Sequence, residues 1–356
     1  MARLPFLTVL SFGLCFFEFA CAAEPVAKAG ATPQQVRQTV ERAFGYLQGQ
    51  STQWLATRKC AACHHVAMPL WVMGEAERRG YAIDKKWFAK TAESTFGGQE
   101  QMIAAKLIYG PKDAPDPRPE GRGVRMGLVF MAVAAETFAA PSAGQKHCLQ
   151  VVQDNILTTQ LKDGSWNFLD DRPPIHESRA SDAAWIMIAL GGLAHSQPTP
   201  TERAVIDKGM AWLEGTRLAE NHQGKVLKLL LAIRAGKPRD QMQAAIAELL
   251  SLQRPDGGWR QTANMASDAY ATGQTLYVLS LAGYSAGRSE KIRPEIKRAI
   301  DFLVTTQKAD GSWPMVSRGK PGGKPSKLLT PITCAATSWA TLSLARLVPK
   351  NESVAD

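Results

Sequence analysis

Hydrophobic residues recur along this chain at the spacing of amphipathic helices. Three apolar stripes are clear: Val36, Val40, Ala43, Phe44 and Leu47; Met242, Ile246, Leu249 and Leu250; and Ile296, Ala299, Ile300 and Leu303. Positions three or four apart share one helix face, so each stripe predicts a helix with one buried side. Other stretches, such as 181–195, 267–283 and 333–347, are apolar or small nearly all round and predict fully buried helices.

The two kinds of helix alternate along the chain. Outer helices are expected near residues 35–48, 84–109, 145–160, 203–216, 239–252 and 294–306, and inner ones near 66–79, 123–138, 181–195, 224–235, 267–283 and 332–347. Connectors rich in Pro and Gly separate them. No stretch keeps the alternation of a β-strand. The predicted fold class is all-α, a single (α/α)6 toroid of about six helical hairpins around a central cavity.

Three short segments repeat the pattern Gln-x-x-Asp-Gly-Ser/Gly-Trp, at residues 160–166, 253–259 and 307–313. Asp-Gly favours a tight turn between two helices. The glutamine side chain can bond backbone groups left free at a helix end, and the tryptophan is expected to pack over the turn. The repeats therefore indicate structural duties in regularly stacked hairpins.

These segments resemble the QW repeats of the squalene–hopene cyclase and protein prenyltransferase superfamily, and residues 267–279 are similar to its inner helices. The resemblance implies an α/α toroid that holds an isoprenoid substrate. It does not carry the chemistry across, because the Asp-x-Asp-Asp acid motif of the cyclases is absent from this sequence. Cys334 also lacks the spaced Asp and His that complete the prenyltransferase zinc site.

Asp182 and Asp268 are the candidate catalytic residues. Each lies in a Ser-Asp-Ala triplet at the start of an expected inner helix. A carboxyl there would face the cavity mouth as a general acid, or would simply favour the positive end of the helix dipole. Aromatic residues expected in the cavity are Trp185, Tyr270, Tyr277 and Trp339.

The N-terminus has the features of a secretory signal peptide. Arg3 precedes an apolar run at 4–17, and small residues at 20–23 suit cleavage. The run is too short for a spanning helix, although an uncleaved anchor is the alternative. The expected divisions are a signal peptide at 1–23, a flexible segment at 24–34, the toroid at 35–348 and a tail at 349–356. The mature protein is expected in the periplasm or outside the cell.

Cys60-Ala61-Ala62-Cys63-His64 matches the attachment motif of c-type haem. The two thiols can bond the two haem vinyl groups, and the His64 imidazole can reach the iron as an axial ligand. Attachment takes place outside the cytoplasm, in agreement with the expected export. Three other interpretations stay open: a redox dithiol, a simple disulfide, and a zinc site completed by His64 or His65 with Cys148 or Cys334.

Other residues near the motif are expected to surround the haem. Trp54 and Trp71 are expected to pack against the porphyrin, and Arg58 and Lys59 are expected to pair with its propionates. Met68 and His65 lie on the same side of the iron as His64 and do not suit the sixth position. Met73, His176, His195 and His222 remain candidates, as does a vacant position.

Composition excludes few classes of function. The chain is 45% hydrophobic and 21% charged, as expected of a globular protein, with a net charge of +10 spread along polar helix faces. No aromatic-basic pattern indicates a nucleic-acid partner. The first hypothesis is an exported haem-bearing toroid with a redox or sensing role and a redox partner. The alternatives are an enzyme on a small hydrophobic isoprenoid, an (α/α)6 carbohydrate lyase or hydrolase, and a binding scaffold.

Overall fold

The computed structural model describes residues 30–58, 63–97, 124–167, 173–193, 198–218, 221–284, 293–315, 318 and 331–350. Apart from two isolated β-bridges, the described regular structure is helical, which confirms the predicted all-α fold class. Residues from Ala31 onward form one compact unit. The expected signal peptide lies outside the described residues. No described helix combines the length and the apolar character needed to cross a bilayer.

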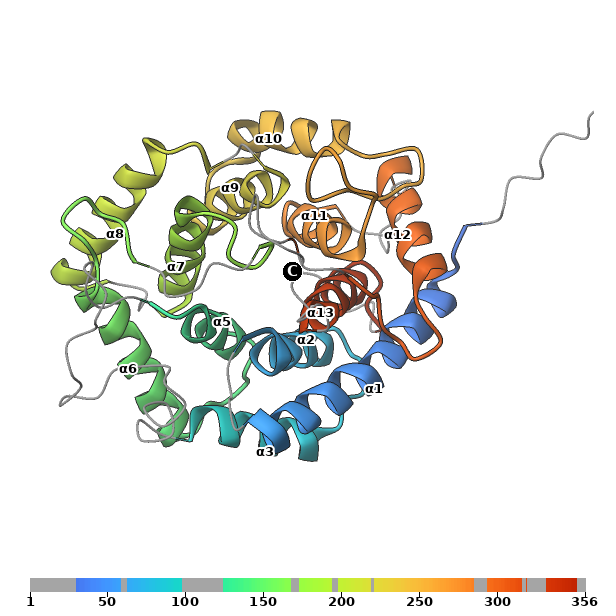
Figure 1. Ribbon diagram of the computed structural model, residues 1–356, viewed down its shortest axis with the longest axis horizontal. Coiled ribbons are helices and arrows are strands. Elements are labelled where there is room, and N and C mark those ends of the chain that lie inside the picture. Colours follow the sequence, from blue (N-terminus) through green and yellow to red (C-terminus); the bar gives the residue numbers. More distant parts are fainter. Residues whose placement is uncertain are drawn as a thin grey trace, which may run out of the picture. The chain divides into compact units, whose positions relative to one another are not determined.

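The helices of this unit form an inner and an outer ring (Figure 1). The inner helices are α2 (Ala67–Arg78), α5 (Met126–Ala135), α7 (Arg179–Leu193), α9 (His222–Arg234), α11 (Ala269–Leu281) and α13 (Pro331–Leu347). The outer helices are α1 (Pro33–Arg58), α3 (Lys85–Phe96), α6 (Ala143–Thr158), α8 (Pro200–Glu214), α10 (Arg239–Ser251) and α12 (Pro294–Thr306). Each inner helix contacts the next, and α13 contacts α2, so the inner ring is closed.

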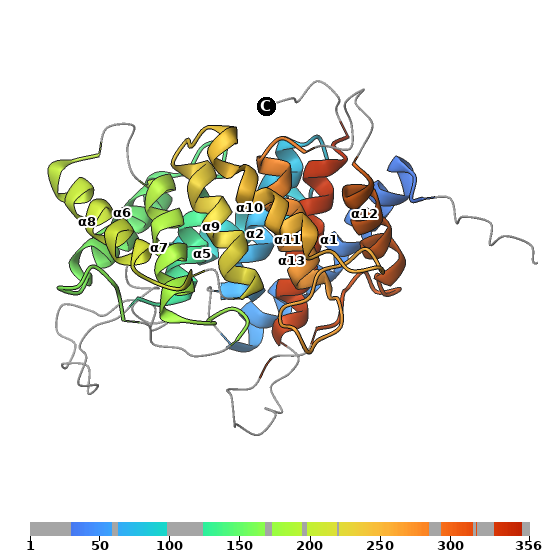
Figure 2. The ribbon, with the colours of Figure 1, turned by 90° about the horizontal axis from the view of Figure 1, so that it is seen from above.

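Burial follows the sequence pattern. In α12 only the stripe of Ile296, Ala299, Ile300 and Leu303 is buried, whereas every residue of α5 is buried. Because an outer helix runs back after each inner one, the inner helices all point the same way, and Figure 2 shows them side by side with roughly parallel axes. Their N-terminal ends therefore share one mouth of the ring.

Helix α1 continues to Arg58, well beyond its expected end at residue 48. Gly45 and Gly49 flank this point and the residues at 50–53 are polar, which locally favours a stop. Tertiary contacts extend the helix instead: the Ser51 hydroxyl is 2.6 Å from the His65 carbonyl oxygen, and Trp87 Nε1 donates to Thr52 Oγ1 at 3.1 Å. The expected second outer helix is described only to residue 97.

The three repeated tryptophans anchor the turns as expected. Each indole Nε1 donates to a carbonyl near the end of the preceding outer helix: Trp166 to Ile156 (2.9 Å), Trp259 to Leu249 (2.7 Å) and Trp313 to Leu303 (2.9 Å). These bonds satisfy carbonyl groups that a helix end leaves free. The predicted structural role of the repeats is confirmed.

The repeated glutamines also join neighbouring hairpins, which the sequence did not indicate. Each side-chain Nε2 donates to its own turn and to the next outer helix: Gln160 to Gly164 and Val205, Gln253 to Gly257 and Glu295, and Gln307 to Gly311 and Thr39. Thr39 belongs to α1, so the last repeat ties α12 to the first helix and closes the outer ring.

Charged residues meet where the inner helices end. Arg346 of α13 pairs with Glu75 of α2, and Arg79 Nε lies 3.1 Å from the same Glu75 carboxylate. Arg234 at the end of α9 lies 2.7 Å from Glu136, which follows α5. Basic side chains at helix C-termini complement the helix dipole. This mouth of the ring is therefore held by ion pairs between inner helices.

Candidate functional site

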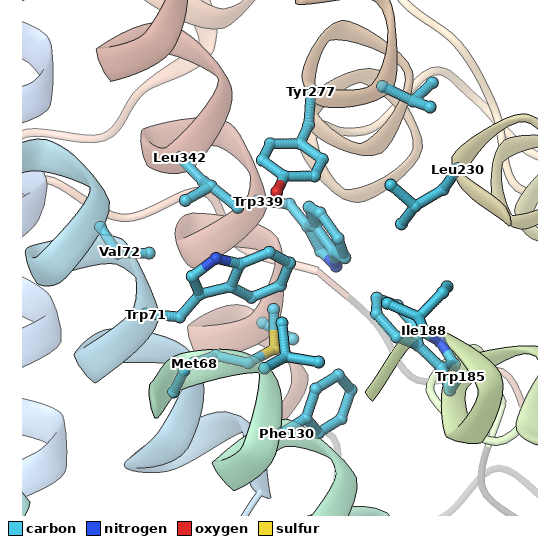
Figure 3. Packing of buried hydrophobic residues seen from close by; sticks show 14 of the residues in the cluster. Met68, Trp71, Val72, Phe130, Trp185, Ile188, Leu230, Tyr277, Trp339 and Leu342 are labelled. Atoms are coloured by element: carbon cyan, nitrogen blue, oxygen red, sulfur yellow. The ribbon is translucent and has the colours of Figure 1, made fainter. Parts of the chain in front are cut away.

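Aromatic side chains from α2, α5, α7, α11 and α13 meet at the centre of the inner ring (Figure 3). Ring centroids of Trp339 lie 5.2 Å from Trp71, 5.6 Å from Tyr277, 5.9 Å from Trp185 and 6.5 Å from Tyr270, and Phe130 lies 5.3 Å from Trp185. These six residues are called the central aromatic cluster below. All are at most 4% exposed.

The four aromatic residues expected in the ring all belong to this cluster. Trp71 and Phe130 complete it, although Trp71 was expected beside a porphyrin. Aromatic faces attract cations, and this attraction strengthens where water is excluded. The centre of the ring is therefore suited to an apolar molecule that carries or develops positive charge.

Asp182 lies in the first turn of α7, at the N-terminal mouth. It precedes Trp185 by three residues, so both side chains share one face of the helix, and Trp185 points into the cluster (Figure 3). Its Oδ2 is 3.6 Å from Nδ1 of His176, and both residues are buried. The structure thus holds a carboxyl–imidazole pair one helical turn from the aromatic centre.

Asp268 occupies a different position, as the N-cap of α11. Its Oδ1 accepts from the backbone N–H of Ala271 at 2.9 Å, and its Oδ2 accepts from Gln261 Nε2 at 3.0 Å. Burial raises the pKa of the Asp268 carboxyl, and these hydrogen bonds oppose the rise. The cap role follows directly from this geometry.

The two aspartates belong to one polar cluster. Gln261 accepts from Arg318 Nε at 2.9 Å, and Arg318 pairs with the carboxylate of Glu177. Burial raises the pKa of Glu177, the charge of Asp182 adds to the rise, and Arg318 opposes it. Glu177, Gln261 and Arg318 carried no sequence signal, because their contacts join segments far apart in the chain.

A pair of glutamines lies beside this cluster. Tyr270 donates its hydroxyl hydrogen to Gln223 Oε1 at 2.6 Å, and Gln274 Nε2 donates to the same oxygen at 3.0 Å. Tyr270, Gln274 and Tyr277 are spaced along one face of α11, and Tyr277 points into the central aromatic cluster (Figure 3). Polar and aromatic groups therefore adjoin on this face.

The Cys-x-x-Cys-His segment is described only in part. Cys60, Lys59 and the side chains of Arg58 and Cys63 lie outside the described residues. Cys63–His65 form a short 3-10 helix, η1, which leads into α2 at the N-terminal mouth. The His65 ring stacks on Trp54 with centroids 3.9 Å apart, and the half-buried His64 ring lies 4.4 Å from His65.

Most of the other residues expected around a haem have partners or positions elsewhere in the fold. Met73 is buried in the core of α2, His176 faces Asp182, and His222 Nε2 lies 3.1 Å from the carbonyl oxygen of Ala271. His195 lies outside the described residues. Trp71 belongs to the central aromatic cluster instead of sharing a wall with Trp54.

The two cysteines considered as zinc ligands are buried, Cys148 in α6 and Cys334 in α13. Burial raises the pKa of the Cys148 thiol to about 12, which disfavours the thiolate that binds a metal. Among the side chains that the structure describes, no three His, Cys, Asp or Glu residues group as a metal site.

Comparisons with known proteins agree with the ring architecture. The family model of the squalene-hopene cyclase C-terminal domain matches residues 219–354. Drimenyl diphosphate synthase from Streptantibioticus cattleyicolor is 29% identical over 196 residues, which cover 49% of this chain and 34% of that protein. The chain thus spans about a third of the length of this curated relative.

Solved structures extend the likeness to nearly the whole chain. A type II terpene cyclase from Scytonema, in complex with geranylgeranyl dihydroxybenzoate, shares 12% identity with a TM-score of 0.51, over 89% of this chain and 98% of its own. The fold is the α/α toroid of the terpene cyclases. A polysaccharide lyase also matches, at 11% identity and a TM-score of 0.55, over 92% of this chain and 100% of its own. The toroid by itself therefore does not select an activity.

Proposed function

We propose that this protein binds an isoprenoid in the centre of the ring and isomerises it by protonating a carbon–carbon double bond. The observation that carries the proposal is the buried carboxyl of Asp182, one helical turn from Trp185 in the central aromatic cluster. The likeness to drimenyl diphosphate synthase and to the squalene-hopene cyclase domain supports an isoprenoid substrate.

Asp182 acts as the general acid in this proposal. Its carboxyl proton passes to one alkene carbon and leaves a carbocation on the other. The faces of Trp185, Trp339 and the neighbouring rings stabilise that cation while new carbon–carbon bonds form. Loss of a proton to a carboxylate of the cluster ends the reaction, so substrate and product are isomers. His176, at 3.6 Å, orients the Asp182 carboxyl.

Asp268 acts as a positioning residue. Both of its carboxyl oxygens already accept hydrogen bonds, from the Ala271 N–H and from Gln261. Through Gln261 and Arg318 it holds the Glu177 carboxylate beside Asp182. The missing Asp-x-Asp-Asp motif is thus replaced by carboxyls that come together from separate segments.

The same cluster disfavours an acidic polysaccharide as substrate. Glu177, Asp182 and Asp268 are three carboxyls, and Arg318 is the cation that pairs within their network. A uronic acid chain would add like charge to this mouth. The apolar centre below it suits a hydrocarbon chain better than a polar sugar.

The test compares the wild type with Asp182→Asn on squalene, farnesol and farnesyl diphosphate, with products identified by gas chromatography and mass spectrometry. Loss of the acid should lower turnover about 10²- to 10⁴-fold with an unchanged thermal midpoint. Asp154→Asn, on the exposed face of α6, is the control and should retain the wild-type rate. Absence of any cyclic product from the wild type, or full activity of Asp182→Asn, would refute the proposal.

We also propose that the protein is exported and that Cys60, Cys63 and His64 hold a c-type haem. The donor set suits this group, since two thiols followed by an imidazole are its usual partners. The thiols would bond the vinyl groups, and His64, half-buried in η1 just before α2, would ligate the iron. When bound, the haem supplies a one-electron redox or ligand-sensing centre for a redox partner.

The visible spectrum tests this second proposal. Protein made in a host that assembles c-type cytochromes should show a Soret band that survives acid–acetone extraction. Cys60→Ser combined with Cys63→Ser should remove the covalent band, whereas Cys148→Ser, at a buried position of α6, should retain it. A colourless wild-type preparation would contradict the proposal.

A further inference from the structure

We propose that Gln223 and Gln274 bind a neutral hydroxyl group, so that the ligand of the ring is an isoprenoid alcohol instead of a diphosphate. The inference rests on the proposed function, because it names the substrate class of the same ring centre.

The two amides leave one donor and one acceptor unused. Gln223 Oε1 accepts from both Tyr270 and Gln274. Within the described part of the chain, Gln223 Nε2 and Gln274 Oε1 are buried and have no hydrogen-bond partner. The residues are only 3% and 1% exposed, so water does not satisfy these atoms from the surface. Buried polar groups are rarely left in this state.

Turning both amides over leaves the same two kinds of group unused. If both side chains are turned over, Gln223 Nε2 donates to Gln274 Oε1, and Gln274 Nε2 and Gln223 Oε1 are left without partners. Either arrangement offers one donor and one acceptor. A hydroxyl group suits both, because its oxygen accepts one hydrogen bond while its hydrogen is donated in the other.

The hydrocarbon part of such a ligand has a place beside the pair. Gln274 shares one face of α11 with Tyr270 and Tyr277, and both tyrosine rings contact Trp339. Figure 3 shows Tyr277 and Trp339 pointing to the centre of the ring. These rings are buried against one another, so a bound chain must separate them. Tryptophan fluorescence should report that change.

The charges around the pair select against a diphosphate. Burial raises the pKa of Tyr270, and the negative charges of Glu177 and Asp268 add to the rise while Arg318 opposes it. The tyrosine that bonds Gln223 therefore lies in a negative field. A diphosphate would bring further negative charge into a desolvated position, which is strongly unfavourable. An alcohol brings none.

Binding of farnesol and of farnesyl diphosphate to the full chain tests the inference, with tryptophan fluorescence as the readout. Farnesol should bind at least about 10-fold more tightly than farnesyl diphosphate. This is the ratio expected if the diphosphate loses about one of the hydrogen bonds that the hydroxyl group makes with the amides. Gln223→Met and Gln274→Met should each weaken farnesol binding about 10-fold. Gln150→Met, on the exposed face of α6, is the matched control and should bind like the wild type.

The thermal midpoint separates a binding role from a structural one. Gln274→Met removes an acceptor without a partner and leaves Gln223 Oε1 bonded to Tyr270, so its midpoint should stay the same or rise while affinity falls. Gln223→Met also removes the acceptor of Tyr270 and Gln274, so its midpoint should fall. Equal affinity for farnesol and farnesyl diphosphate, or wild-type affinity in both folded methionine variants, would overturn the inference.

The two proposals fail in different ways. Titrations repeated on Asp182→Asn exclude turnover from the binding data. Glutamine-dependent farnesol binding without any cyclic product refutes the acid mechanism and leaves this inference standing. Cyclic product from farnesyl diphosphate, with affinity unaffected by the glutamines, overturns this inference and leaves the acid mechanism standing.

Discussion

His222 is a histidine at the start of α9 whose ring is buried against α11. Its Nε2 lies 3.1 Å from the Ala271 carbonyl oxygen and 2.8 Å from Thr275 Oγ1. Burial lowers the pKa of His222 to about 4, with the charge of Lys225 adding to the effect and the bond to Ala271 opposing it. The folded protein therefore holds this imidazole neutral at pH 7.

Stability should depend on pH through His222. Its pKa falls from 6.5 to about 4 on folding, so its contribution is complete above pH 6.5 and is lost as pH falls toward 4. The loss amounts to about 3 kcal/mol, at about 1.4 kcal/mol per pKa unit. Urea unfolding at pH 4.5 and 7.5 should show a smaller pH effect for His222→Gln than for the wild type. His147→Gln, exposed on α6, should retain the wild-type pH dependence. An equal change in the free energy of unfolding between the two pH values in all three proteins would contradict the role given to His222.

The sequence located Asp182 and Asp268 but not the relation between them. Their identical Ser-Asp-Ala triplets predicted equivalent positions at helix starts. The structure places Asp268 before α11 as an N-cap and Asp182 within the first turn of α7. Asp268 is connected through Gln261 and Arg318 to Glu177, whose carboxyl lies in the field of Asp182, and only the folded chain brings these residues together.

The Asp-Gly turns between helices are both a local sequence feature and a packing contact. Gly257 has a φ of +86°, which side chains other than glycine rarely adopt. A Cβ added there would also lie 2.4 Å from the Arg298 carbonyl oxygen in α12. The glycine therefore allows both the turn and the close approach of the next outer helix.

Substitution at two glycines separates these effects. Gly257→Ala combines a left-handed backbone with a backbone clash and should lower the free energy of unfolding by about 2 kcal/mol or more. At Gly236 φ is +64°, but a Cβ added there would have no atom within 4 Å. Gly236→Ala should therefore lower the free energy of unfolding by only about 1 kcal/mol. Chemical denaturation measures both. Equal losses would show that the contact with α12 is unimportant.

The helices themselves were predictable because amphipathic periodicity is a local property. Helix α12 begins at Pro294 and ends at Thr306, within the expected range. Helix α1 continued past its predicted end because Ser51 and Thr52 find partners in η1 and α3. Propensity favoured a stop in this polar segment, and tertiary contacts overrode it.

At the scale of the whole molecule, closure of the ring depends on contacts between the two ends of the chain. Arg346 of α13 pairs with Glu75 of α2, and both side chains are less than 10% exposed. Gln307 joins its turn to Thr39 of α1 in the outer ring. Both contacts link the last hairpin to the first.

Removal of Arg346 should weaken this closure. Arg346→Met removes one of the two cations that pair with the buried Glu75 carboxylate among the described residues, and should lower the free energy of unfolding by about 3 kcal/mol. Lys85→Met is the control, because Lys85 is 82% exposed in its pair with Glu77 and should change stability by less than about 0.5 kcal/mol. Differential scanning calorimetry gives both values. A small effect of Arg346→Met would mean that packing alone closes the ring.

The sequence by itself determined the helices, their inner or outer position and the duties of the repeated Asp-Gly turns and Trp residues. Periodicity, turn formation and helix capping act over a few neighbouring residues, so their signals can be read along the chain. Only the tertiary structure decided that Trp71 and Phe130 join the central aromatic cluster, and that Gln223 meets Gln274. Such groupings arise where distant segments pack together and water is excluded, and no local pattern encodes them.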